Sequence, residues 1–171
     1  QEWDDASESW VDFVRNGKDY FRDEMNNPGM FEILGDIQGK KVLDLGCGEG
    51  YNTRIMAKKG AKVVGIDFSE KMFDFAVQHE EKEKLGIDYH VLDACNLHLF
   101  GNCMFDIVAC FMALMDIDDY QTSINEAARV LKNKGRFVFI ITHPCFDTII
   151  IKDTILDAWE FKEGGDKSPE N

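Results

Sequence analysis

The chain is poor in proline and histidine and has no long apolar run. Its 171 residues include only 3 Pro and 4 His, and no apolar stretch approaches the roughly 20 residues of a membrane-spanning helix. The N-terminal residues Gln1–Asp5 are acidic, whereas a secretory signal begins with basic residues and continues with apolar ones. With 44% apolar residues and no low-complexity segment, the composition is typical of a folded, cytoplasmic protein with one sizeable core.

Basic residues are also scarce. The chain has 32 Asp and Glu against 19 Lys and Arg, which gives a formal net charge of −13. Phosphate backbones and anionic lipid surfaces repel such a charge. We therefore expect neither nucleic acid nor a membrane surface to be a partner.

The sequence lacks the spacings of disulfide frameworks and metal sites. The five cysteines are odd in number and contain no C-x-x-C pair, which suits reduced thiols. Three carboxylates, Asp116, Asp118 and Asp119, have no neighbouring histidine and no glycine turn. We predict no metal site, and we expect Asp118 or Asp119 to cap the helix that follows.

Residues 1–38 are predicted to form an N-terminal helical cap. This segment has ten acidic and three basic residues, and its apolar residues recur at helical spacing as one stripe. The stripe consists of Trp3, Ala6, Trp10, Phe13, Val14, Tyr20 and Phe21. The pattern breaks at Asn26–Gly29, and a short helix is expected to follow. Two interpretations remain open: the helices pack on the flank of the domain, or they form a lid over a ligand pocket.

From Gly39 onward, short β-rich runs alternate with helical stretches, which is typical of βαβ units and a parallel sheet. We predict an α/β core over residues 39–146 with a Rossmann-like, doubly wound, mostly parallel sheet. Residues 147–171 form an incomplete C-terminal segment. The expected strands are 41–45, 62–66, 89–92, 105–111 and 136–142, with a short extra strand over 148–151. The expected helices are 52–59, one that begins after Ser69, and one from about 119 that the segment 132–135 terminates.

A glycine-rich segment, Asp44–Gly50, lies between the first predicted strand and the first helix of this core. In an open parallel sheet, ligands bind beyond the carboxyl ends of the strands, and glycines there permit a close backbone approach to the ligand. Asp67 ends the second strand about 20 residues later, where a carboxylate can accept hydrogen bonds from ribose hydroxyls. The combination predicts a cofactor that contains adenosine.

The glycine spacing disfavours a dinucleotide. The fingerprint G-x-G-x-x-G requires its third glycine where this chain has Tyr51, one residue after Gly50. Glu49 also adds a negative charge at the helix N-terminus, where a pyrophosphate would bind. A zwitterionic or cationic cofactor fits better, and a nucleotide-dependent oxidoreductase is the less favoured alternative.

Several motifs in register resemble those of the class I S-adenosylmethionine-dependent methyltransferases, and the resemblance covers about residues 39–146. The motifs are Val42–Gly50 for the glycine-rich loop, Val64–Ser69 for the ribose-binding segment, Asp93–Ala94 for the adenine contact, Phe105–Val108, and Ala128–Gly135. The resemblance implies the class I methyltransferase fold. It also implies S-adenosylmethionine as cofactor, S-adenosylhomocysteine as product and a small-molecule acceptor.

The resemblance implies two groups of cofactor-binding residues. The first is expected to surround the methionine part and consists of Asp44, Gly46, Cys47, Gly48, Phe111 and Met112. The second is expected to bind the nucleoside and consists of Asp67 for the ribose, Phe68 and Met72 beside the adenine, and Asp93 and Ala94 for its polar edge. Structural roles remain open for some of them, namely capping for Asp44 and Asp93 and core packing for Phe68 and Met72.

Methyl transfer from a sulfonium is an in-line displacement, so the main tasks of the protein are alignment and exclusion of water. A general base is needed only where the acceptor must lose a proton. His143, at the end of the fifth predicted strand, is the candidate for this base. The alternative is a strand-end histidine that bonds to neighbouring backbone.

We therefore predict a methyltransferase that acts on a small molecule. The alternative is a catalytically silent cofactor-binding or regulatory module, which the short C-terminal part and the lack of a clear base favour. The family normally continues with a helix and a closing antiparallel hairpin, for which residues 147–171 are too few. One hypothesis is that the chain is truncated and lacks its C-terminal strands. In that case the exposed sheet edge is expected to pair with another chain, such as a second copy in a homodimer.

Overall fold

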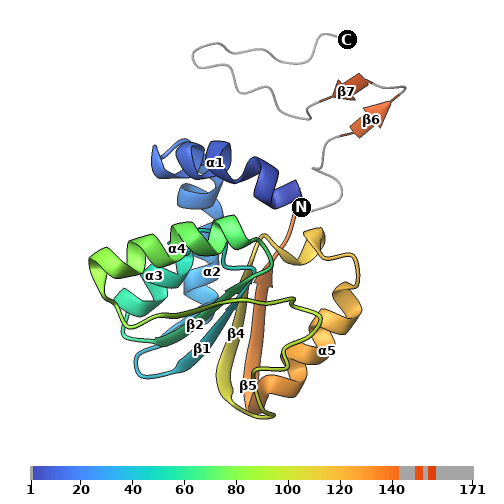
Figure 1. Cartoon of the computed structure of the whole chain (residues 1–171). Helices are drawn as coiled ribbons and strands as arrows, with labels where there is room; N and C mark the ends of the chain where they lie inside the picture. The colour runs from blue at the N-terminus through green and yellow to red at the C-terminus, as the bar shows by residue number, and fades with distance from the viewer. Residues whose placement is uncertain (1, 143–148, 152–153, 157–171) are drawn as a thin grey trace. The chain divides into compact units, whose positions relative to one another are not determined.

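The computed structural model describes residues 2–142, 149–151 and 154–156 (Figure 1). Residues 1–141 cluster into one compact unit and residues 142–171 into another. The first unit holds a five-stranded sheet and the helices that accompany it. In the second, β6 (Ile149–Ile151) and β7 (Thr154–Leu156) pair as antiparallel strands, and β6 corresponds to the predicted extra strand.

The five-stranded sheet is parallel throughout and has the order β3-β2-β1-β4-β5 (Figure 1). Its strands are β1 (Lys41–Leu45), β2 (Lys62–Asp67), β3 (Asp88–Val91), β4 (Phe105–Phe111) and β5 (Leu131–Ile140). The chain moves outward from β1 to β3 and then returns to the other side of β1 for β4 and β5. The topological switch point therefore lies between β1 and β4. This is the doubly wound α/β arrangement that the alternating sequence pattern predicted.

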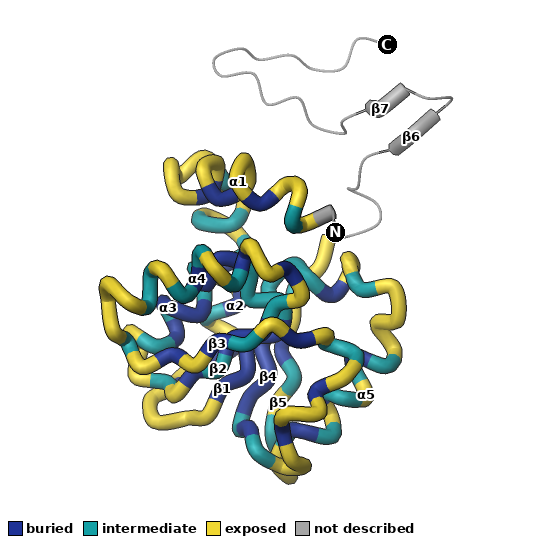
Figure 2. The backbone as a smooth tube through the Cα atoms, viewed as in Figure 1, coloured by how far each residue is buried: buried dark blue, intermediate teal, exposed yellow. Residues whose placement is uncertain are grey.

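Helices cover both faces of the sheet, because the central strands are apolar on both sides (Figures 1 and 2). On one face, Leu43 and Val108 share a core with Ala127 of α5 (Tyr120–Val130). On the other face, Val42 packs in a second core with Met56. Met56 belongs to α3 (Tyr51–Lys58), and α4 (Glu70–Glu83) packs beside β3. Successive residues of β1 thus serve opposite cores.

Two helices begin at the side-chain caps that the sequence predicted. The Ser69 hydroxyl accepts a hydrogen bond from the backbone N–H of Met72 at the start of α4 (3.1 Å). Asp119 accepts one from the backbone N–H of Thr122 at the start of α5 (3.0 Å). Each cap satisfies a donor that has no partner within its helix.

The N-terminal segment is continuous helix where a break was predicted. A π-helix, η1 (Phe21–Asn26), runs directly into α2 (Asn27–Leu34). Pro28 lies in the first turn of α2, where its fixed φ is compatible with helical backbone. The break predicted at Asn26–Gly29 is therefore wrong, and α2 instead buries Met30 in the core of the sheet.

Helix α1 (Glu2–Arg15) buries only part of the predicted stripe. The buried residues of α1 are Ser7, Val11 and Val14. Trp3, Trp10 and Phe13 are between 37% and 42% exposed. The stripe therefore describes the buried face of α1 only in part, because Val14 is buried whereas the large rings remain half uncovered.

The terminator predicted after α5 is also wrong, since the helix ends at Val130 and β5 begins at Leu131. Leu131 pairs with Phe105, and the register then shifts before the regular pairing resumes. Lys132 Nζ contacts the Asp106 carboxylate at 2.8 Å within this shift. Residues 132–135, which the sequence pattern assigned to a turn, therefore belong to the irregular start of β5.

A close contact at Gly65 gives a test of this packing. A Cβ there would lie 2.7 Å from the Tyr89 ring and 3.1 Å from Cys47 Sγ. We expect Gly65→Ala to lower the free energy of unfolding by about 1–3 kcal/mol, because overpacking displaces a buried ring. Gly29→Ala is the matched control, since nothing lies within 4 Å of its Cβ. Urea denaturation measures both changes, and equal stabilities of the two variants would contradict the packing described.

Candidate functional site

A cavity of about 890 Å³ lies beyond the carboxyl ends of the strands. Every residue that the sequence analysis named for the cofactor lines it, namely Asp44, Gly46, Cys47, Gly48, Asp67, Phe68, Met72, Asp93, Ala94, Phe111 and Met112. The candidate base, His143, lies outside the described residues. The structure therefore brings the two predicted groups together in one place, and it leaves their individual roles as proposals.

The glycine loop is held close to the end of β2. The backbone N–H groups of Gly46 and Cys47 both donate to the carbonyl oxygen of Ile66, at 3.0 and 2.9 Å. Gly46 has a φ of +71°, and a Cβ at this position would overlap the side chain of Ala113. Only glycine fits both the left-handed backbone and the close approach. The loop can therefore turn sharply while its backbone faces the cavity.

Asp67 fastens the same loop from the end of β2. Its carboxylate accepts from the backbone N–H of Gly48 at 2.7 Å and from that of Ser69 at 2.9 Å. Burial raises the pKa of this carboxyl group, and the backbone donors act in the opposite direction. Each carboxylate oxygen of Asp67 accepts one backbone hydrogen bond and can accept a second one from another donor.

Asp44 has the most unusual environment in the cavity wall. It is 1% exposed, and one of its oxygens accepts a 2.6 Å hydrogen bond from the Thr53 hydroxyl. The other oxygen, Oδ1, is buried and has no partner. Burial raises the pKa of Asp44 to about 7. A buried acceptor without a donor is costly, and a positively charged donor in the cavity would remove this cost.

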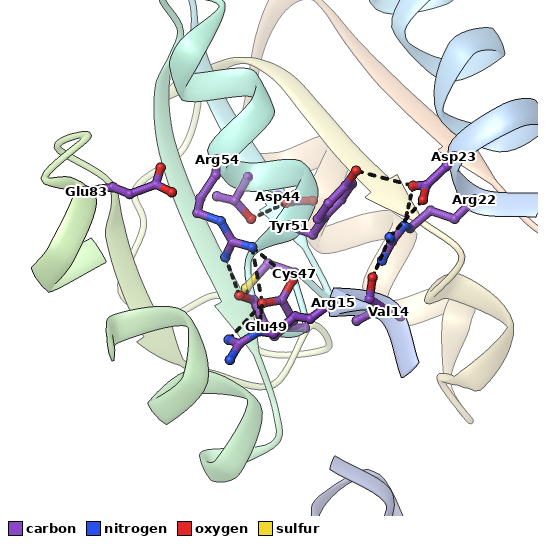
Figure 3. Close-up of polar contacts among 12 residues, drawn as sticks. Val14, Arg15, Arg22, Asp23, Asp44, Cys47, Glu49, Tyr51, Arg54 and Glu83 are labelled. Atoms are coloured by element: carbon purple, nitrogen blue, oxygen red, sulfur yellow. Dashed lines mark hydrogen bonds and ion pairs between the residues drawn. The ribbon is translucent and has the colours of Figure 1, made fainter. Parts of the chain in front are cut away.

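Glu49 does not present a free charge to the cavity. It is 3% exposed, and its carboxylate forms ion pairs with Arg54 and Arg15, each at 3.0 Å (Figure 3). Arg54 also donates to the Glu49 carbonyl oxygen at 2.6 Å. The electrostatic argument against a pyrophosphate that the sequence suggested for Glu49 is therefore wrong, because two arginines neutralise the carboxylate. The argument from glycine spacing does not depend on it.

Two contacts join the N-terminal helices to the loop region (Figure 3). Arg15 of α1 reaches Glu49, as described. The guanidinium of Arg22 in η1 lies 3.9 Å from the centre of the Tyr51 ring. The Tyr51 hydroxyl donates to Asp23 at 3.3 Å, and Arg22 pairs with the same carboxylate. Both sides of the glycine loop are thereby connected to the segment that precedes the sheet.

A third contact holds the other end of α1. Asp4 accepts hydrogen bonds from the hydroxyl of Ser69 and from the backbone N–H of Lys71, at the start of α4. Trp3, Trp10 and Val14 of α1 line the cavity. Helix α1 thus packs on α4 and also forms part of the cavity wall, so it combines features of the two interpretations that the sequence left open.

The sequence analysis missed the polar residues that make these connections. Arg15 and Glu49 are 34 residues apart, and Tyr51 and Asp23 are 28 apart. No local sequence pattern predicts such pairs. Taken alone, Arg15 and Asp23 are typical of a solvated helix face, and Glu49 and Tyr51 belong to the glycine-rich region. Only the aromatic stripe, which includes Trp3 and Trp10, indicated that the N-terminal segment meets a ligand pocket.

The acidic segment after β4 divides into a capping part and a cavity part. Asp119 caps α5, as predicted. Asp116 lines the cavity, where burial raises its pKa and the nearby Trp3 side chain acts in the opposite direction. Within residues 2–142, no group of three or more histidine, cysteine or acidic side chains is arranged to hold a metal ion.

Three comparisons place this geometry among known proteins. A family model described as a methyltransferase domain matches residues 43–139, which is more than half of the chain. The ubiquinone biosynthesis O-methyltransferase of Coxiella burnetii (strain Dugway 5J108-111) is 38% identical over 103 residues, which are 60% of this chain and 44% of that protein. An S-adenosylmethionine-dependent methyltransferase from Mesorhizobium loti is 32% identical, with a TM-score of 0.64 over 70% of this chain and 54% of its own. The [4+2]-cyclase SpnF is 26% identical, with a TM-score of 0.59 over 64% of this chain and 41% of its own.

These matches centre on the elements that build the cavity. The family model begins in β1, just before the glycine loop, and ends in β5. The chain spans less than half the length of the curated relative from Coxiella burnetii. The predicted resemblance and fold are confirmed, and S-adenosylmethionine is the cofactor that the match implies. The chain belongs to the methyltransferase-domain family, the class I S-adenosylmethionine-dependent methyltransferases.

Proposed function

We propose that this domain binds S-adenosylmethionine in the cavity and transfers its methyl group to a small-molecule acceptor. One observation carries the proposal. Residues named from motifs far apart in the chain line a single cavity, and one of them, Asp44, has a buried oxygen without a partner. An ammonium group would supply both the missing donor and the opposite charge.

The methionine part of the cofactor is assigned to the loop after β1. Asp44 uses one oxygen for Thr53 and keeps the other for an ammonium group. The backbone of Gly46–Gly48 approaches the cavity closely, and Phe111 and Met112 form the wall at the end of β4. When bound, S-adenosylmethionine supplies a sulfonium whose methyl carbon is open to in-line attack. The residues of the chain align the reactants and keep water away.

The nucleoside part is assigned to the ends of β2 and β3. Asp67 keeps one acceptor site on each oxygen for the ribose hydroxyls. Phe68 is 69% exposed, so its ring has free surface for the adenine, whereas Met72 is 2% exposed and also serves the core. Asp93 accepts one hydrogen bond, from the backbone N–H of Cys95, and can accept a further one from an amino group.

The N-terminal helices are assigned to the exclusion of water. Trp3, Trp10, Val14 and Phe21 line the cavity from α1 and η1. Closure over the reacting groups strengthens electrostatic interactions and prevents hydrolysis. We propose that α1 acts as a lid and that its contact with Glu49 holds the closed state. His143 remains our candidate for a general base where the acceptor must lose a proton.

Location and partners complete the proposal. No helix within the described part of the chain has the length and apolar character needed to cross a bilayer. We propose a cytoplasmic location and no nucleic-acid partner, because a net charge of −13 opposes binding to phosphate. Strand β5 forms an edge of the five-stranded sheet, and we propose a second copy of the chain as its partner. Sedimentation equilibrium tests this homodimer.

Calorimetric titration with S-adenosylhomocysteine tests the cofactor site, with NAD and NADP as controls. Binding of S-adenosylhomocysteine alone would support the assignment. Transfer of a labelled methyl group to a panel of small acceptors then distinguishes an enzyme from a silent binding module. This second step matters because SpnF, a similar fold, carries the name of a cyclase. Failure of S-adenosylhomocysteine to bind, or tighter binding of NAD, would overturn the proposal.

The ribose assignment predicts a loss of affinity in Asp67→Ala. We expect S-adenosylhomocysteine to bind more weakly by about 1–3 kcal/mol, because a charged acceptor is lost from the cavity. Asp88→Ala is the control, since Asp88 is an exposed acidic residue outside the cavity lining. Calorimetry measures both variants. Unchanged affinity in Asp67→Ala would remove Asp67 from the ribose site.

The assignment of Asp44 to the ammonium group predicts that the affinity for S-adenosylhomocysteine depends on pH. The pKa of Asp44 is about 7 in the free protein, and a bound ammonium group favours the ionised carboxylate. Affinity for S-adenosylhomocysteine is therefore expected to rise with pH up to about 7 and then level off, with a limiting slope of about tenfold per pH unit. Titrations between pH 5.5 and 8 in wild type and Asp44→Asn measure this. An identical slope in Asp44→Asn would show that another group titrates.

The raised pKa of Asp44 also predicts how the stability of the unliganded domain depends on pH. A carboxyl group whose folded-state pKa is raised binds more protons in the folded state, so its contribution to stability falls as pH rises from about 4 to 7. We expect Asp44→Asn to gain stability relative to wild type at pH 8 but not at pH 4. Thermal unfolding at the two pH values measures the difference, and an equal effect at both would contradict the shift.

The lid assignment predicts faster cofactor release in Arg15→Gln. Removing Arg15 weakens the connection of α1 to Glu49, while Arg54 still pairs with that carboxylate. We expect the dissociation rate of S-adenosylhomocysteine to rise roughly three- to tenfold, as for other truncated charge pairs. Stopped-flow fluorescence measures the rate. Lys58→Gln is the control because its pair with Glu83 is exposed and lies outside the cavity. Unchanged release in Arg15→Gln would leave α1 as flank packing.

A further inference from the structure

The charges that line the cavity are almost all negative. Among the described residues, the acidic side chains in the lining are Asp19, Asp44, Glu49, Asp67, Asp93, Asp116, Asp118 and Asp119, and the basic one is Arg22. Arg22 is itself paired with Asp23. A cavity with low-dielectric walls and charges of one sign concentrates ligands of the opposite sign.

Most of these carboxylates already have a partner or an assignment. Asp44, Asp67 and Asp93 belong to the proposed cofactor site, and arginines neutralise Glu49. Asp119 caps α5, and Asp19 accepts from the backbone N–H of Arg22. Asp116 and Asp118 remain, and neither forms an ion pair within the described residues. Their charges are therefore available to a ligand.

Two tryptophan rings line the same cavity as Asp116. Trp3 and Trp10 both line the cavity, and their rings are nearly perpendicular, with centroids 5.8 Å apart and an angle of 74°. The Trp3 side chain lies close enough to Asp116 to lower the pKa of its carboxyl group, against the effect of burial. Indole rings at a steep angle with a carboxylate nearby are a typical environment for an organic ammonium group, since ring faces and carboxylate both attract positive charge.

The position of the tryptophans separates them from the shared cofactor machinery. The family model matches residues 43–139, whereas Trp3 and Trp10 lie on α1, before the sheet begins. Both rings keep more than a third of their surface exposed. A helix that served only to pack on the domain would gain more by burying these rings, yet its buried residues are Ser7, Val11 and Val14.

We propose that the methyl acceptor carries a positively charged ammonium group, which is held between Trp3, Trp10 and Asp116. The proposal rests on the proposed function, because it places the acceptor in the same cavity as the cofactor. A neutral phenol gains contact with the rings but nothing from the carboxylates. An anionic acceptor is repelled by them. The O-methyltransferase name of the relative from Coxiella burnetii makes a phenol the competing class, and the test includes one.

A matched pair of probes isolates the charge. Choline and its uncharged carbon isostere 3,3-dimethylbutan-1-ol have nearly the same shape, and catechol represents the phenols. Each probe is titrated by calorimetry into the chain saturated with S-adenosylhomocysteine. We expect choline to bind about tenfold or more tightly than the isostere, the ratio that cation–π attraction and a nearby carboxylate produce together. Choline here reports recognition, so the result does not depend on turnover.

Four variants locate the effect. In Asp116→Asn and in Trp10→Leu, the preference for choline over its isostere is expected to fall below about threefold, because each variant removes one of the attractions. Asp5→Asn and Tyr20→Leu remove a charge and a ring outside the cavity lining and are expected to keep the preference. Circular dichroism and thermal unfolding show that each variant is folded.

The outcomes separate this proposal from the one on which it rests. Equal binding of choline and its isostere to the wild-type chain would overturn the ammonium site. Tighter binding of catechol than of choline, or a preference that survives in both Asp116→Asn and Trp10→Leu, would also overturn it. In each of these cases the cofactor assignment stands if S-adenosylhomocysteine binds. If S-adenosylhomocysteine fails to bind wild type, the proposed function falls and the ammonium site falls with it.

Discussion

The attachment of the glycine loop to the end of β2 is the constraint on which the rest of the site depends. Two loop amides donate to the Ile66 carbonyl, and the Asp67 carboxylate takes a third, from Gly48. These bonds join the loop after β1 to the end of β2, and β1 is one of the two strands that flank the switch point of the sheet. They turn loop backbone toward the cavity, and they leave each Asp67 oxygen able to accept from a ligand.

Glu49 extends this junction to the N-terminal helices. A buried carboxylate between two arginines is well compensated, whereas the loss of either arginine leaves part of the charge without a partner. Arg54 comes from the helix next to the loop, and Arg15 comes from α1. The position of the α1 residues that line the cavity is therefore linked to the glycine loop, which lines it too. The stacking of Arg22 on Tyr51 makes a second link on the other side of the loop. Cofactor binding and the placement of the aromatic wall are thus parts of one arrangement.

The structure shows which of the many acidic residues that it describes have partners and which do not. A net charge of −13 by itself indicates only which large partners are disfavoured. The structure sorts the carboxylates into those that cap helices, those that arginines neutralise, those assigned to the cofactor, and Asp116 and Asp118, which remain free for a ligand. Asp116 and Asp118 lie within the segment that the family model matches, whereas the tryptophans that line the same cavity lie on α1, before that segment. The proposed acceptor site therefore combines residues from inside and from outside the matched segment.

The sequence by itself determined the parallel sheet, the caps at Ser69 and Asp119, and the set of residues around the glycine loop, because these depend on local spacing and on a fixed strand-loop-helix geometry. It misjudged the break at Asn26–Gly29 and the start of β5, where proline position and strand pairing override turn composition. Only the tertiary structure decided that Glu49 is neutralised, that Asp44 keeps an unpartnered oxygen, and that α1 buries Ser7 rather than its tryptophans. The physical reason is that burial and ion pairing are properties of residues distant in sequence, and no periodicity within one segment records which distant side chain will meet another.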